Sequence, residues 1–184
     1  MRRFVAFTAF VILSVALQAT VLVPIEFREL VSIAPVIVHG RVVDVRSALL
    51  DGRRSVETFV TVEAGDYLKG QLGPHFTIRV PGGQVGRYRT VFVGAPEFRA
   101  GDELILFLQT PRASLPHIVG LSQGAFRIVP DPRTGQRVVT TPIVMGKGTG
   151  DVERVVRGDP ARRPLSIDAF RDVVRQVMTQ GSAR

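Results

Sequence analysis

The sequence Val36-Ile37-Val38-His39-Gly40-Arg41-Val42-Val43-Asp44-Val45 is dominated by β-branched side chains. Such side chains are stiff at χ1 and pack well on a pleated surface, so they favour strands over helices. Gly40 interrupts the run, and a glycine inside a strand pattern is typical of a β-bulge or a bend. The run therefore predicts a long strand that changes direction near Gly40.

The segments that follow continue this β pattern. Asp51-Gly52 is typical of a turn, and after Ser55 apolar and polar side chains alternate, with Val56, Thr58, Val60 and Val62 on one face. Residues 66–70 predict a short turn of helix that is closed by Gly70. Further strands are expected at 76–80, 90–93, 103–108, 117–121, 125–129 and 137–141. Their even spacing favours a small barrel or sandwich.

Helical spacing occurs only near the two ends of this strand-rich region. Phe27, Leu30, Val31 and Ala34 share one helical face before Pro35 ends the pattern. At the other end, Ser166 is a candidate N-cap for a helix whose apolar face is Phe170, Val173, Val174 and Val177. We therefore expect one helix before the strands and one after them.

The amino terminus has the anatomy of a secretory signal peptide. Met1-Arg2-Arg3 precedes an apolar stretch from Phe4 to Val23, which contains small residues suited to cleavage after Ala19. The alternative is an uncleaved anchor, because this stretch of 20 mostly apolar residues is long enough to span a bilayer with the arginines on the cytoplasmic side. In both cases we expect the rest of the chain to be exported, secreted or periplasmic.

Composition narrows the classes of function. The net charge is +8 and only Lys69 and Lys147 are lysines, so the positive charge is almost all arginine. The expected partner is an extracytoplasmic protein or an anionic surface, although no arginine-dense block low in acidic residues occurs, which favours a solvated surface of mixed charge. A membrane is expected as partner only if the amino-terminal segment is uncleaved. The chain has no cysteine, which excludes thiol nucleophiles, cysteine zinc sites and haem attachment through cysteine. It also has no Trp and only two Tyr, so we expect no nucleic-acid partner.

Several stretches imitate catalytic or cofactor motifs. Gly120-Leu121-Ser122-Gln123-Gly124 matches G-x-S-x-G, but a strand is expected directly after it and no histidine lies beyond His117. His39, His75 and His117 are 36 and 42 residues apart, without the short spacings of zinc sites. Glycine-rich residues 81–86 and 146–150 lack the strand–loop–helix frame of a phosphate site. We expect no catalytic residue, metal or cofactor, and a hydrolase using Ser122 or a histidine-bound metal is the alternative.

The loops at residues 81–89 and 94–101 are the candidate binding surface. Within them Arg87, Tyr88 and Arg89 combine positive charge with an aromatic ring, and we take these three as the candidate contacts. The alternative interpretation is a solvated arginine-rich loop without a partner.

The motifs of residues 22–130 resemble an uncharacterised group of secreted bacterial proteins. The shared features are Tyr67-Leu68-Lys69-Gly70, Pro81-Gly82-Gly83, Gly94-Ala95-Pro96-Glu97-Phe98, residues 101–108 and residues 120–126. The helix, the strand after it and the Lys69-Gly70 turn are also similar to the netrin-like domain of tissue inhibitors of metalloproteinases. That resemblance implies an OB-type five-stranded barrel. It does not transfer the inhibitory mechanism, which needs an amino-terminal cysteine.

We therefore expect a mainly β protein, a small OB-like β-barrel with an N-terminal helix and a C-terminal helix. The expected division is a signal peptide or uncleaved anchor at 1–19, the barrel domain at 20–141, a flexible segment at 142–164 and the C-terminal helix at 165–184. The expected function is an exported, non-enzymatic binding module. Besides the hydrolase, a protease-regulating netrin-like module remains an alternative.

Overall fold

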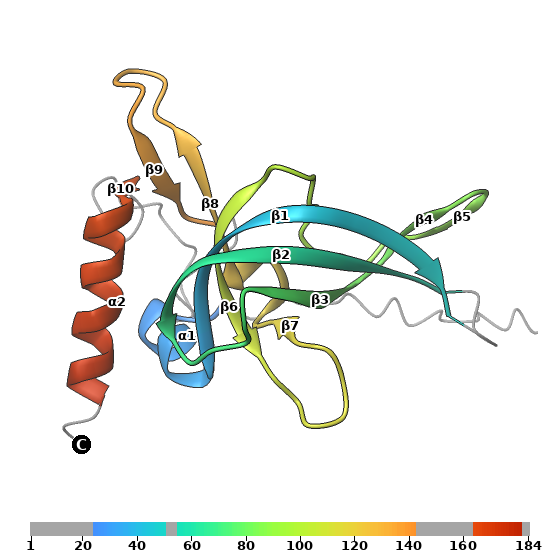
Figure 1. Ribbon diagram of the computed structural model, residues 1–184, viewed down its shortest axis with the longest axis horizontal. Helices are drawn as coiled ribbons and strands as arrows, with labels where there is room; N and C mark the ends of the chain where they lie inside the picture. The colour runs from blue at the N-terminus through green and yellow to red at the C-terminus, as the bar shows by residue number, and fades with distance from the viewer. Residues whose placement is uncertain (1–23, 51–54, 143–163, 182–184) are drawn as a thin grey trace, which may run out of the picture.

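The computed structural model describes residues 24–50, 55–142 and 164–181. A closed five-stranded β-barrel forms its centre, with one helix before the strands and one after them (Figure 1). The expected mainly β, OB-like barrel with an N-terminal and a C-terminal helix is thus confirmed. The predicted signal peptide or anchor at 1–19 and almost all of the predicted flexible segment at 142–164 lie outside the described residues.

The helices and strands follow one another in a simple order. They are α1 (Phe27–Ile33), β1 (Val36–Leu49), β2 (Val56–Lys69), β3 (His75–Pro81), β4 (Gly83–Val85), β5 (Tyr88–Thr90), β6 (Glu103–Gln109), β7 (His117–Ile118), the 3-10 helix η1 (Leu121–Gly124), β8 (Ala125–Pro130), β9 (Arg137–Thr140), β10 (Leu165–Ser166) and α2 (Ile167–Gly181). In this described part of the chain, no helix is long and apolar enough to cross a membrane.

The barrel closes in the order β1-β2-β3-β7-β6 and returns to β1. β1 pairs antiparallel with both β2 and β6, whereas β3 and β7 pair in parallel through Arg79 and His117. A five-stranded closed sheet of this kind is the OB architecture. β8, β9 and β10 extend the sheet outward from β6, and β4 and β5 form a separate hairpin.

The bend predicted at Gly40 is present. The β1–β2 register shifts between His39 and Gly40 and again between Val42 and Asp44. A Cβ atom on Gly40 would lie 2.7 Å from the carbonyl oxygen of Glu63, so a larger residue would push β2 away. Because bulges bend a strand and increase its twist, β1 can pair with β2 along one edge and with β6 along the other.

Two apolar clusters share strand β6 as their common wall. Leu104, Leu106 and Leu108 point into the barrel, while Ile105 and Phe107 point to the opposite face. This alternation follows from the two-residue period of a strand, and it explains why β6 is apolar throughout. The outer cluster is completed by α1 and α2, so both helices cover the same face of β6. Because both faces of β6 are buried in apolar clusters, apolar packing holds the helices to the barrel without any disulfide.

The helices end and begin where the sequence predicts. In α1, Leu30, Val31 and Ala34 are buried, and the Lys69 ammonium donates to the Val31 carbonyl oxygen at 2.8 Å. In α2, the Ala169 amide donates to the Ser166 hydroxyl oxygen at 3.2 Å, which is the expected N-cap bond. Burial lowers the pKa of Lys69, because the ammonium loses water on the strand side of the helix end.

Four local predictions are wrong. Residues 66–69 continue β2 rather than forming a helical turn, because they pair with Ile37, Val38 and His39 at the start of β1. The strand expected at 90–93 stops at Thr90, and the strand expected at 117–121 stops at Ile118. Val173 is exposed, since the buried stripe of α2 is narrower than predicted and centres on Phe170 and Val174.

Candidate binding site

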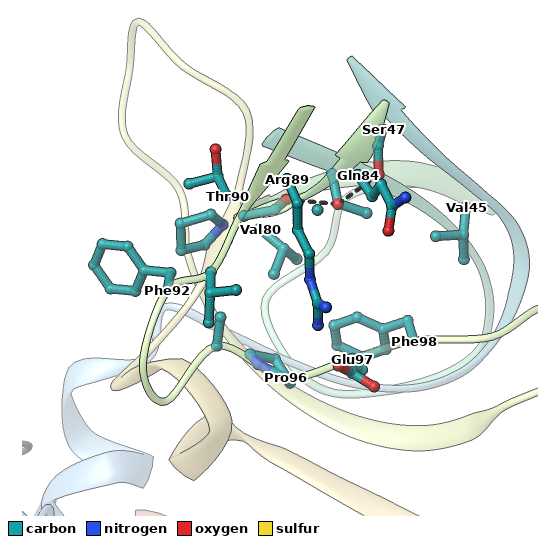
Figure 2. A pocket seen from close by; sticks show the side chains of 16 residues that line it. Val45, Ser47, Val80, Gln84, Arg89, Thr90, Phe92, Pro96, Glu97 and Phe98 are labelled. Atoms are coloured by element: carbon teal, nitrogen blue, oxygen red, sulfur yellow. Dashed lines mark hydrogen bonds between the residues drawn. The ribbon is translucent and has the colours of Figure 1, made fainter. Parts of the chain in front are cut away.

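A cleft of about 420 Å³ opens at the end of the barrel where β1 and β3 finish and β2 begins. We call it the mouth cleft. Its floor is formed by apolar residues that include Val45, Val80 and Phe98, and its rim carries Gln84, Arg89 and Glu97 (Figure 2). Val80 and Phe98 also belong to the barrel core, so the cleft is a continuation of that core to the surface.

The β4–β5 hairpin forms one wall of the mouth cleft and is fixed at its root. The Thr58 hydroxyl donates to the Gly82 carbonyl oxygen at 2.7 Å and lies 3.0 Å from the Ser47 hydroxyl. A Cβ atom on Gly83, where φ is +136°, would collide with the Thr58 hydroxyl. At the other end of the hairpin, the Val56 amide donates to the Thr90 hydroxyl oxygen at 2.9 Å. These contacts hold the root of the hairpin against β1 and β2.

Arg89 and Glu97 place one positive and one negative group on the rim of the mouth cleft. Figure 2 shows the Arg89 side chain pointing toward Phe98 and Glu97. Both residues are exposed, and within the described residues neither has an ion-pair partner. Arg127 contacts Glu97 only at its backbone carbonyl oxygen. Two charges beside an apolar floor are therefore available to a partner.

Three consecutive apolar residues lie at the edge of the same cleft. Val91, Phe92 and Val93 are 71%, 46% and 67% exposed, although they carry no charge and are strand formers by type. Two of them, Val91 and Phe92, line the mouth cleft. A contiguous apolar surface beside a cleft is typical of an interaction site, whereas isolated exposed apolar residues are not.

The structure separates the three predicted contact residues. Arg89 lines the mouth cleft, while Arg87 and Tyr88 lie toward the tip of the β4–β5 hairpin and do not line it. The Arg87 guanidinium donates to the Tyr88 hydroxyl at 3.0 Å and lies 5.1 Å from the centre of its ring. The loop predicted at 81–89 is thus an ordered hairpin.

Sequence reasoning missed residues 91–93 as site residues, whereas Glu97 lies in the loop predicted at 94–101 as part of the binding surface. Residues 91–93 were expected to form a strand and so to be half-buried. The available signal was the lack of polar alternation directly before Gly94, because an exposed strand alternates and this segment does not.

A second cleft of about 250 Å³ adjoins the first and bears on the hydrolase alternative. It contains Glu57, Arg79 and His117, with the Glu57 carboxylate 3.4 Å from Arg79 Nε. Ser122 lines neither cleft. A serine nucleophile at an elbow would itself sit at the strained position, yet the residues with positive φ here are Gly120 and Leu121. The turn leads into η1 and then directly into β8, so the strand–turn–helix context of that motif is not formed.

The three histidines occupy different surroundings. His75 lies opposite Glu63 at the start of β3, and His117 lies opposite Arg79 on β7. His39 donates through Nε2 to Glu103 and accepts at Nδ1 from Arg171. Among the described residues, no group of three or more His, Asp or Glu side chains is arranged to hold a metal ion.

The surroundings of His39 form a compact charged group that joins α2 to the barrel. We call His39, Asp66, Glu103, Arg137 and Arg171 the His39 cluster. Glu103 lies 2.7 Å from His39 Nε2 and also pairs with Arg137, while Arg171 lies 3.2 Å from Asp66. Because a carboxylate accepts and a guanidinium donates, His39 must be neutral with its proton on Nε2. Burial and the neighbouring Arg171 and Arg137 guanidinium groups lower the pKa of His39.

The charged groups of the His39 cluster are paired with one another, whereas the mouth cleft places Arg89 and Glu97 beside exposed apolar surface with no ion-pair partner among the described residues. Comparison of the chain with protein-family models, with curated proteins and with solved structures finds no match. The two resemblances drawn from sequence motifs therefore stay predictions.

Proposed function

We propose that this protein is an exported, non-enzymatic binding module that holds its partner at the mouth cleft and on the β4–β5 hairpin. The observation that carries the proposal is the exposed apolar segment Val91-Phe92-Val93 beside Arg89 and Glu97, which have no ion-pair partner in the described part of the chain. Leaving three apolar side chains in water is unfavourable, and binding recovers the free energy of their burial. The rigid root of the hairpin supports the proposal, because a surface fixed in advance loses less entropy on binding.

The proposed partner is an extracytoplasmic protein or an anionic surface. The two arginines of the hairpin favour an anionic group, since a guanidinium pairs with carboxylates and phosphates in a bidentate manner. Export is proposed from the sequence at residues 1–19.

The test is retention of a partner by immobilised protein from envelope and secreted fractions of the cells that make it. The binding variant is Arg89→Ala combined with Phe92→Ala. The matched control is Arg133→Ala combined with Val173→Ala, which removes an exposed arginine and an exposed apolar residue away from the cleft. We expect the wild type and the control to retain the same partner and the binding variant to lose it.

Two results would contradict the proposal. Equal retention by all three proteins would place the binding surface elsewhere. Hydrolysis of an ester or peptide substrate that disappears in Ser122→Ala would show an enzyme.

A further inference from the structure

Residues 91–93 present three consecutive apolar side chains to solvent. Val91, Phe92 and Val93 are 71%, 46% and 67% exposed, so the described residues leave a large part of each uncovered. The segment has left strand β5 and begins to turn at Val93, so these side chains are not confined to the two faces of a sheet. Insertion into a lipid interface would cover apolar side chains that point in different directions.

The position of the segment suits contact with a broad surface. The β4–β5 hairpin projects from the end of the barrel, on the side away from α2 (Figure 1). Residues 91–93 leave β5 directly and run along the rim of the mouth cleft. The projecting hairpin can therefore meet a planar surface, and residues 91–93 lie at its root beside Gly82.

The charge on residues 87–93 themselves is of one sign, and Glu97 is the carboxylate on the rim of the same cleft. Between Asp66 and Glu97 the sequence contains no Asp or Glu, whereas Arg87 and Arg89 lie on the hairpin itself. Both arginines are exposed, and no carboxylate among the described residues pairs with them. Guanidinium groups bind phosphate oxygens in a bidentate manner, and basic residues next to a bilayer are attracted by anionic lipids.

The aromatic residues complete the pattern. Tyr88 has an apolar ring and a hydroxyl that contacts Arg87, and it lies between the two arginines. Amphipathic rings of this kind concentrate at the level of lipid headgroups. Phe92 lies among the purely apolar residues, which belong at the boundary between headgroups and acyl chains.

We infer that residues 87–93 dock onto an anionic lipid bilayer, with Val91, Phe92 and Val93 at the acyl boundary and Arg87 and Arg89 on lipid phosphates. This inference rests on the proposed function, since it names the partner of the same surface. A lipid bilayer is favoured over a protein because the β4–β5 hairpin projects from the barrel, and because residues 87–93 combine three exposed apolar side chains with two arginines and no acidic residue.

The absence of tryptophan from the chain allows a local test. Phe92→Trp places one indole in the segment, and Val173→Trp places one on the exposed face of α2 as the control. The full chains are mixed with vesicles of phosphatidylcholine, with or without phosphatidylglycerol. We expect a blue shift of emission for Phe92→Trp with the anionic vesicles only, and no shift for Val173→Trp. Because the signal is local, it is independent of any contact made by residues 1–23.

Removal of the two arginines tests how much charge contributes to vesicle binding, separately from apolar contact. In the Phe92→Trp background, Arg87→Gln with Arg89→Gln is expected to weaken vesicle binding about twenty-five-fold, at about fivefold for each charge. Arg133→Gln in the same background is the control and should leave the titration unchanged. An unchanged titration in the double variant would overturn the inference.

The two proposals can fail separately. If the emission of Phe92→Trp does not shift with anionic vesicles but shifts with proteins of the envelope fraction, the lipid inference is wrong and the proposed binding function stands. If the emission responds to neither, both are wrong. Equal shifts with anionic and neutral vesicles would also overturn the inference, because the arginines would then have no role.

Discussion

At the α2 end of the molecule each charged group of the His39 cluster has a partner of opposite sign, whereas at the mouth Arg89 and Glu97 have none among the described residues. Aromatic residues differ in the same way. Phe170 packs against Phe27, Phe107 and Phe126 with ring centres 5.0–6.5 Å apart, while Phe92 is half exposed. The same residue types hold the fold together in one region and remain available to a partner in the other.

The largest difference between the regions is expected for phenylalanine. Phe170→Ala should lower the free energy of unfolding by about 3 kcal/mol, because it removes a buried ring from the outer cluster and leaves a cavity. Phe92→Ala should change it by less than about 0.5 kcal/mol, since the ring is already hydrated. Urea unfolding followed by circular dichroism measures both values. Equal losses would mean that Phe92 is a core residue.

The next difference concerns the carboxylates. Glu103→Gln should destabilise the protein by about 2 kcal/mol, since the half-buried groups of His39 and Arg137 would lose their shared acceptor charge. Glu97→Gln should leave stability within about 0.5 kcal/mol, because that carboxylate is exposed. The same unfolding measurement applies. A large loss in Glu97→Gln would show that the mouth has its own structural ion pair.

The sequence predicted the barrel better than the site. The β-branched run at Val36, the bulge at Gly40 and the cap at Ser166 are local signals, and each acts through the backbone of its own element. The path of residues 66–69 is not local, because pairing with the start of β1 overrides the helical pattern there. The exposure of residues 91–93 also depends on how the whole barrel packs. The type of a residue does not show whether the folded barrel will cover its side chain.

A smaller effect is expected from the root of the hairpin. Thr58→Val removes the hydrogen bond to the Gly82 carbonyl oxygen and should cost about 1 kcal/mol. Thr61→Val is the matched control, because Thr61 contacts Thr77 in mid-barrel at 3.3 Å and lies away from the mouth cleft. Both variants should lose similar stability. Only Thr58→Val should weaken partner retention, and equal retention would show that the hairpin does not need its fixed root.

The smallest expected effect comes from protonation of His39 at low pH, without any substitution. Because the folded state lowers the pKa of His39, the unfolded chain binds this proton more readily. Above pH 6.5, the ordinary pKa of a histidine side chain, His39 is neutral in both states and does not affect stability. As the pH falls through 6.5, the unfolded state gains the proton first and the free energy of unfolding declines.

The decline should be visible between about pH 7 and pH 5.5, above the range where most carboxylates titrate. His39→Gln should flatten it, since the glutamine amide can donate to Glu103 and its oxygen can accept from Arg171 without titrating. Unfolding free energies at several pH values test both proteins. If the wild type and His39→Gln decline in parallel, His39 is not the titrating group. If only the wild type declines, acid loosens the attachment of α2 through this histidine, while binding at the mouth cleft should stay constant over the same pH range.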